Sequence, residues 1–100
     1  MEDRENNEME RIHIWVKGRV QGVGFRAFAQ QTGMQFSLTG WVRNIGYDTV
    51  EIVAEGTHEK LEKFAGLVKI GPRAGNVADV KVEWETALGE YRSFIVKYNI

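Results

Sequence analysis

The chain has no cysteine, a single proline and no long apolar run. Without cysteine, a disulfide framework, a thiol nucleophile and a thiolate metal site are all excluded. No stretch approaches the roughly 18 apolar residues that a membrane helix needs, and the first residues lack the apolar segment of a signal peptide. We therefore expect a cytoplasmic protein with no membrane partner.

An excess of charge of one sign is also lacking, since 13 basic residues stand against 14 acidic ones. A general nucleic-acid binder shows a basic stripe, so we expect no nucleic-acid partner. The first eleven positions hold five acidic residues against two basic ones, and they have no aromatic residue and no apolar periodicity. We expect residues 1–11 to be a flexible acidic extension and residues 12–100 to form one domain with its own core.

Apolar periodicity indicates how this domain is organised. Alternating apolar residues predict strands over about 11–20, 36–44, 49–55 and 80–84, and a short last strand from Phe94. Helical spacing predicts one helix from about Gly24, capped by Gly33, and a second from Thr57 to the Gly71-Pro72 break. The order β-α-β-β-α-β plus a short C-terminal strand is typical of the ferredoxin-like, split β-α-β sandwich. This α+β fold predicts an antiparallel sheet with both helices on one face.

The segment from Gly18 to Arg26 (GRVQGVGFR) joins the first strand to the first helix. Free backbone N–H groups at a helix start, together with the charge of Arg26, are suited to cradle a phosphate. The spacing matches neither the P-loop nor the dinucleotide-binding fingerprint. A glycine-rich turn more often serves only to reverse the chain, so the segment alone is weak evidence.

A second segment, GWVRN from Gly40 to Asn44, ends the second predicted strand, and VEIVAEG follows over 50–56. Together with GRVQGVGFR, these motifs closely resemble those of the acylphosphatases, small enzymes that hydrolyse carboxyl–phosphate mixed anhydrides. The resemblance covers about residues 12–98. It implies an acyl phosphate as substrate, inorganic phosphate as product, and neither a metal nor a cofactor.

The resemblance also implies the roles of individual residues. In the family, a loop wraps the phosphoryl group with backbone N–H donors, and its counterpart here is Gln21, Gly22, Val23, Gly24, Phe25 and Arg26. Arg26 matches the arginine that binds the phosphate, and Asn44 matches the asparagine that holds the attacking water. Taken singly, Arg26 is more typical of a solvated helix face, and Asn44 of a turn. The two residues together, within the matching motifs, favour the roles that the resemblance implies.

The sequence departs from the acylphosphatase motifs in two ways that bear on these roles. The predicted hairpin turn Ile45–Asp48 lacks the proline and the Asp-Gly pair common in the family, which leaves the placement of Asn44 open. The motifs also resemble the N-terminal domain of the hydrogenase-maturation carbamoyltransferase, in which proline usually follows Phe-Arg. Here Ala27 follows and the chain ends at Ile100, so we expect a free-standing, monomeric enzyme.

A different class of function stays open on the residues alone. Ferredoxin-like sheets also serve as RNA or protein platforms, with neighbouring aromatic residues and a basic surface on the open face. The tryptophans, Trp15, Trp41 and Trp84, more often pack in strands than stack nucleobases. His13 and His58 share no carboxylate pattern that suggests a metal site, so we interpret both as surface or structural residues.

Overall fold

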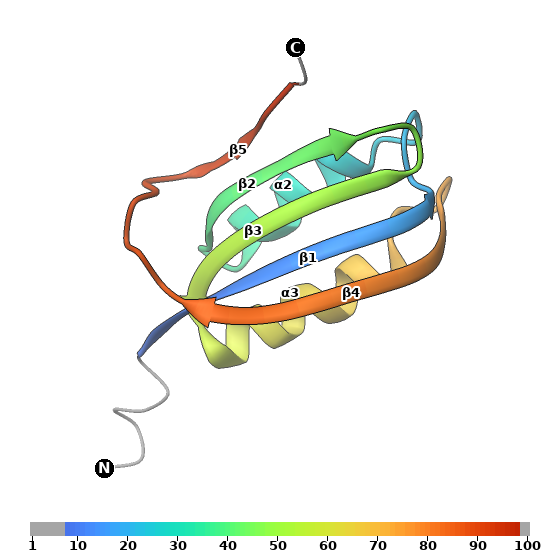
Figure 1. The fold of residues 1–100 in the computed structure, drawn as a ribbon. Helices are drawn as coiled ribbons and strands as arrows, with labels where there is room; N and C mark the ends of the chain where they lie inside the picture. The colour runs from blue at the N-terminus through green and yellow to red at the C-terminus, as the bar shows by residue number, and fades with distance from the viewer. Residues whose placement is uncertain (1–7, 99–100) are drawn as a thin grey trace.

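The computed structural model describes residues 8–98, and in this part of the chain two helices pack on one face of a five-stranded sheet (Figure 1). The elements follow the predicted order: β1 (Met9–Arg19), α2 (Phe25–Gln35), β2 (Thr39–Ile45), β3 (Thr49–Thr57), α3 (His58–Ile70), β4 (Asn76–Thr86) and β5 (Phe94–Val96). The ferredoxin-like arrangement is confirmed. Neither of these helices is long and apolar enough to cross a membrane.

The strands lie in the order β4-β1-β3-β2-β5. β1 pairs antiparallel with β3 and β4, and β2 pairs antiparallel with β3, as expected. The expectation of a wholly antiparallel sheet was wrong for β5, which runs parallel to β2. These pairings make β4 antiparallel to β2, so the chain leaves β4 at the end of the sheet where β2 begins. β5 must then run in the direction of β2.

The core lies between the sheet and the two helices. Alternate strand residues point into it and meet the apolar faces of α2 and α3, which explains the period of two in the strands. Its largest fully buried side chains are Phe25, Phe64, Ile12, Ile14, Ile52, Leu61, Val16, Val20, Val42, Val50 and Val68. Both helices lie on this side of the sheet, and we call the opposite side its open face (Figure 1).

The first strand begins earlier than the sequence predicted. Residues 9–11 pair with residues 55–57 of β3, so this part of the predicted extension belongs to the sheet. Arg11 explains the difference, because its guanidinium lies 3.8 Å from Glu55 on one neighbouring strand and 3.3 Å from Glu85 on the other. The rest of the predicted flexible extension, apart from Glu8, lies outside the described residues.

The prediction that Gly33 caps the first helix was also wrong. α2 continues to Gln35, and β2 consequently begins at Thr39 rather than near Phe36. Gly33 is buried inside the helix, where an added Cβ would lie 2.5 Å from the ring of Phe94 on β5. The glycine is therefore needed for the close approach of helix and strand rather than for a turn.

Ion pairs and stacked rings cover the open face of the sheet. Glu51, which is buried, accepts hydrogen bonds from Arg43 at 2.6 Å and from the ring of His13 at 2.7 Å. The His13 ring stacks on Trp15 with 3.8 Å between centroids, and Trp41 is only 7% exposed. His13 therefore has a structural role, as predicted, and these aromatic residues pack within the protein.

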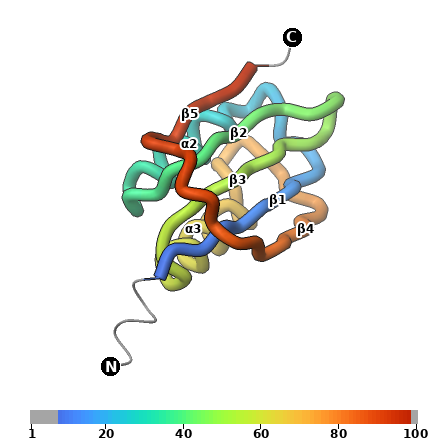
Figure 2. The backbone as a smooth tube through the Cα atoms, turned by 60° about the vertical axis from the view of Figure 1, so that its left-hand side comes forward, coloured from blue at the N-terminus to red at the C-terminus, as the bar shows by residue number. Residues whose placement is uncertain are grey.

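The connection between β4 and β5 (residues 87–93) runs past the end of the sheet at which β2 begins (Figure 1, Figure 2), and it contacts side chains of the open face there. Glu55, 2% exposed, accepts hydrogen bonds from the backbone N–H groups of Leu88 at 2.8 Å and Gly89 at 3.0 Å. The hydroxyl of Tyr91 accepts further hydrogen bonds from Trp41 and Arg11. These contacts fix the connection and direct the chain onto the edge of β2.

Candidate active site

The loop between β1 and α2 exposes its backbone. Gly22 and Gly24 have positive φ angles of 75° and 81°, which favour glycine, and Gly24 is the N-cap of α2. A Cβ at either glycine would meet no atom of the described residues within 4 Å, so open space lies beside them. The first N–H groups of a helix have no partner within the helix. The loop and helix start therefore present backbone donors on an open surface.

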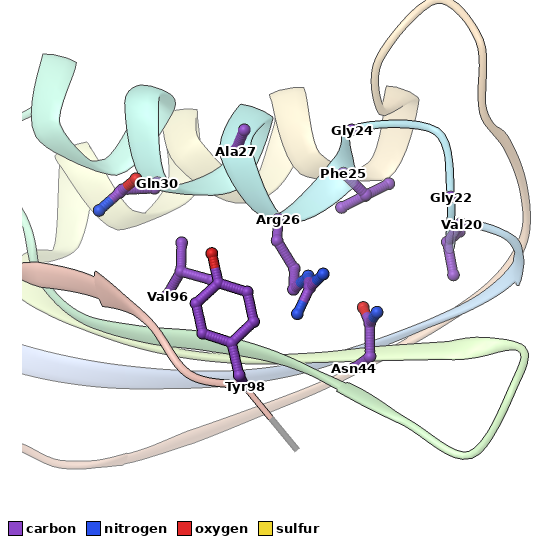
Figure 3. Close-up of a pocket in the computed structure, with 10 residues that line it drawn as sticks. All are labelled: Val20, Gly22, Gly24, Phe25, Arg26, Ala27, Gln30, Asn44, Val96 and Tyr98. Carbon is purple, nitrogen blue, oxygen red and sulfur yellow. The ribbon is translucent and has the colours of Figure 1, made fainter. Parts of the chain in front are cut away.

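This surface forms one wall of a cavity of about 260 Å³ (Figure 3). The loop, the first turns of α2, the end of β2 and the chain after β5 all contribute to it. Its lining residues are Val20, Gly22, Gly24, Phe25, Arg26, Ala27, Gln30, Asn44, Val96 and Tyr98. The structure thus brings together Arg26 and Asn44, the two residues that the resemblance assigned to catalysis.

The guanidinium of Arg26 extends from the start of α2 into the cavity, toward the side chain of Asn44 (Figure 3). Its Cζ lies 4.8 Å from the centre of the Tyr98 ring, a cation–π distance. Sequence reasoning assigned Tyr98 only to the last strand, and its proximity to Arg26 depends on the parallel pairing of β5. The arginine therefore has an aromatic neighbour on one side and the cavity on the other.

Asn44 lies near the end of β2, where it pairs with Val50. Its side chain points to the helix side of the sheet, whereas its neighbour Arg43 reaches Glu51 on the open face. Its Oδ1 atom is buried and has no hydrogen-bond partner among the described residues. An unsatisfied buried acceptor costs about 1–3 kcal/mol. A hydrogen-bond donor bound in the cavity would remove that cost.

Of the remaining predicted loop residues, Phe25 lines the cavity, whereas Gln21 and Val23 do not. Phe25 is buried and Val23 packs against the core. The side-chain amide of Gln21 donates to the carbonyl oxygens of the β2–β3 hairpin and does not line the cavity. Among the predicted loop residues, Gly22 and Gly24 contribute to the cavity through backbone alone, and Arg26 contributes the charge.

Backbone donors, one arginine and one unpartnered amide oxygen around a small cavity can together bind and stabilise an anionic group such as a phosphoryl group. Among residues 8–98, no three histidine or carboxylate side chains cluster closely enough to hold a metal ion.

Comparisons with known proteins identify the family to which the chain belongs. The acylphosphatase family model matches residues 12–96. The acylphosphatase of Thermus thermophilus is 47% identical over 81 residues, which cover 81% of this chain and 92% of the relative. The crystal structure of the Bacillus subtilis acylphosphatase superposes with a TM-score of 0.85 at 38% identity, covering 91% of this chain and 100% of that one. The chain belongs to the acylphosphatase family.

The same comparisons bear on the alternative of a larger enzyme. Full-length HypF, in its phosphate- and nucleotide-bound form, matches with a TM-score of 0.80 at 26% identity. The match covers 91% of this chain but only 12% of HypF. The match to the Bacillus subtilis acylphosphatase, in contrast, covers 100% of that protein. The family membership supports a hydrolase that cleaves acyl phosphates to carboxylate and inorganic phosphate, and the binding-module alternative is not favoured.

Proposed function

We propose that Arg26 and the backbone of the loop hold the phosphoryl group of an acyl phosphate while Asn44 orients the water that attacks it. The observation that supports this proposal is the unpartnered, buried Oδ1 of Asn44, which lines the same cavity as the guanidinium of Arg26. An acceptor and a cation on two sides of one cavity suit a water molecule and an anion, respectively.

The phosphoryl group carries negative charge on its equatorial oxygens in the loose transition state of phosphoryl transfer. The planar fork of Arg26 can donate to two of those oxygens. The N–H groups at the start of α2 and the positive end of its dipole favour the same charge. Because these donors are in place before substrate binds, they stabilise the transition state without reorganising.

The attacking water needs a fixed position more than a strong base. The Oδ1 of Asn44 accepts a hydrogen bond from one water O–H, which directs an oxygen lone pair toward phosphorus. An amide cannot remove a proton near neutral pH, so the proton leaves late or passes to the phosphoryl oxygens of the substrate. The departing carboxylate is a good leaving group, and no strong general acid is required. A pH profile that demands a protein base near neutrality would contradict this step.

The test is phosphate release from benzoyl phosphate, corrected for spontaneous hydrolysis. We expect Arg26→Ala and Asn44→Ala each to lower kcat/KM by at least about a hundredfold, the loss typical of a removed transition-state contact, with unchanged circular dichroism. Arg73→Ala is the matched control, because Arg73 is exposed and does not line the cavity. If either site variant keeps most of its activity, the role of that residue is wrong.

We further propose that the enzyme is a metal-independent, cytoplasmic monomer with no nucleic-acid partner. On the open face, Arg43 is paired with Glu51, and Arg11 with Glu55 and Glu85, so these cations are neutralised locally. Activity that is unchanged by a chelator, a monomeric mass in solution and no salt-dependent RNA binding are the expected results.

A further inference from the structure

Gln21 joins the two halves of the proposed site. Its Nε2 atom donates hydrogen bonds to the carbonyl oxygens of Ile45 at 3.1 Å, Gly46 at 3.3 Å and Thr49 at 2.9 Å. Ile45 and Thr49 form the last strand pair before the turn, so the amide lies across the base of the hairpin. One side chain therefore links the loop to both strands of the hairpin.

Each end of this link is adjacent in sequence to a part of the cavity. Gln21 precedes Gly22 in the loop, and Ile45 follows Asn44 on β2. The turn between the strands is exposed, with Tyr47 at 88%, and lacks the proline that would stiffen it. A second hydrogen bond joins this turn to the end of β1, from the N–H of Gly18 to the carbonyl oxygen of Asp48 at 2.9 Å. That bond lies farther from Asn44 in sequence.

We infer that Gln21 is a positioning residue, whose side-chain amide holds Asn44 at the correct distance from the phosphate-binding loop. The inference rests on the roles proposed above for Arg26 and Asn44. A displacement of about 1 Å of a reacting group can lower the rate about a hundredfold. Loss of the link should therefore reduce kcat, because water and phosphoryl group lose their alignment, while the loop itself still binds phosphate.

The chemistry of the link supplies a specific test. All three partners of Gln21 are carbonyl oxygens, so the group between them must be a donor. In Gln21→Glu, an ionised carboxylate of nearly the same shape would face three acceptors and be repelled. A protonated carboxyl group has one O–H donor, and the surrounding acceptors favour this neutral form. The variant should therefore recover the link at acidic pH.

The experiment measures kcat and the inhibition constant for inorganic phosphate at pH 7.5 and pH 4.5, each relative to the unmodified enzyme. We expect Gln21→Glu to lose about ten- to a hundredfold in kcat at pH 7.5 and to regain most of it at pH 4.5. Gln21→Met, which has no donor, should stay slow at both pH values. The phosphate constant of Gln21→Met should change less than about twofold at either pH, since the loop donors remain.

Gln31→Glu is the matched control, because it adds the same charge at an exposed position of α2 outside the cavity. It should follow the unmodified enzyme at both pH values. A Gln21→Glu variant with unchanged kcat at pH 7.5, or one that is equally slow at both pH values, would overturn the inference. If Gln21→Glu unfolds at pH 7.5, the comparison moves to pH 4.5, where it must be faster than Gln21→Met.

This result is separable from the test of the site itself. If Arg26→Ala and Asn44→Ala lose activity while Gln21→Glu does not, only the positioning role fails. If Arg26→Ala or Asn44→Ala keeps its activity, the proposed roles fail whatever Gln21→Glu shows.

Discussion

Two glycines, each inside a helix, should differ in stability after the same substitution to alanine. Gly66 in α3 is exposed, and a Cβ there would meet no atom of the described residues within 4 Å. Gly33 in α2 is buried, and a Cβ there would lie 2.5, 2.6 and 3.0 Å from three ring carbons of Phe94. Alanine at either site therefore gains the same helical propensity, but only at Gly33 does it meet an obstacle.

The magnitudes decide the sign of each effect. Glycine to alanine inside a helix stabilises by about 1 kcal/mol, so Gly66→Ala should raise the free energy of unfolding by about that amount. Forcing an extra methyl group against a packed ring costs about 1–3 kcal/mol. For Gly33→Ala the cost offsets or exceeds the gain, which leaves a net loss of about 0–2 kcal/mol. In a domain of this size, 1 kcal/mol shifts Tm by about 4–8 °C.

The assay is thermal and urea unfolding of both variants, with kcat on benzoyl phosphate as a second readout. Because Phe94 begins β5, displacing its ring also moves the strand that carries Val96 and Tyr98 to the cavity, so Gly33→Ala should lower kcat as well. Shortening the ring with Phe94→Leu should relieve the clash, which a double-mutant cycle measures. If Gly33→Ala stabilises as much as Gly66→Ala, the packing argument is refuted.

Three further perturbations test other contacts. The hydrogen bond to Glu10 raises the pKa of His58 above 6.5. The protonated ring therefore stabilises the fold at low pH, and this contribution should be lost as pH rises through the folded pKa. An NMR titration of the ring checks the direction of the shift, and Glu10→Gln should lower the pKa. Tyr98→Leu removes the ring beside Arg26 and should lower kcat/KM by about two- to fivefold, the equivalent of an exposed cation–π contact, with Tm unchanged. Glu55→Ala deprives two backbone N–H groups and one arginine of their buried acceptor and should destabilise by about 3 kcal/mol in urea unfolding; a loss below 1 kcal/mol would contradict that role.

The local patterns of the sequence predicted the elements and their order well. Alternation and helical spacing depend only on which face of an element is buried, and that information is local. The motifs also predicted that Arg26 and Asn44 belong to one site, and both line the same cavity. Asn44 lines that cavity although the hairpin turn departs from the family pattern.

Features that depend on partners distant in sequence were not predicted. Gly33 has the local appearance of a helix cap, and only the ring of Phe94 shows why α2 continues. The parallel direction of β5 follows from where the chain leaves β4, and the position of Tyr98 beside Arg26 follows from that direction. Likewise, the residues around Gln21 give no local sign that its side-chain amide contacts the β2–β3 hairpin.

The central position of β3 has a consequence for how the enzyme becomes active. The loop follows β1 and Asn44 lies on β2, yet β1 and β2 are not neighbours, because β3 lies between them (Figure 1). The two halves of the site meet only after β3 has paired with both strands, and such long-range pairing is slow compared with helix formation. During refolding, helical circular dichroism should therefore return before phosphate release does. The recovery of catalytic activity would then report when the sheet is complete.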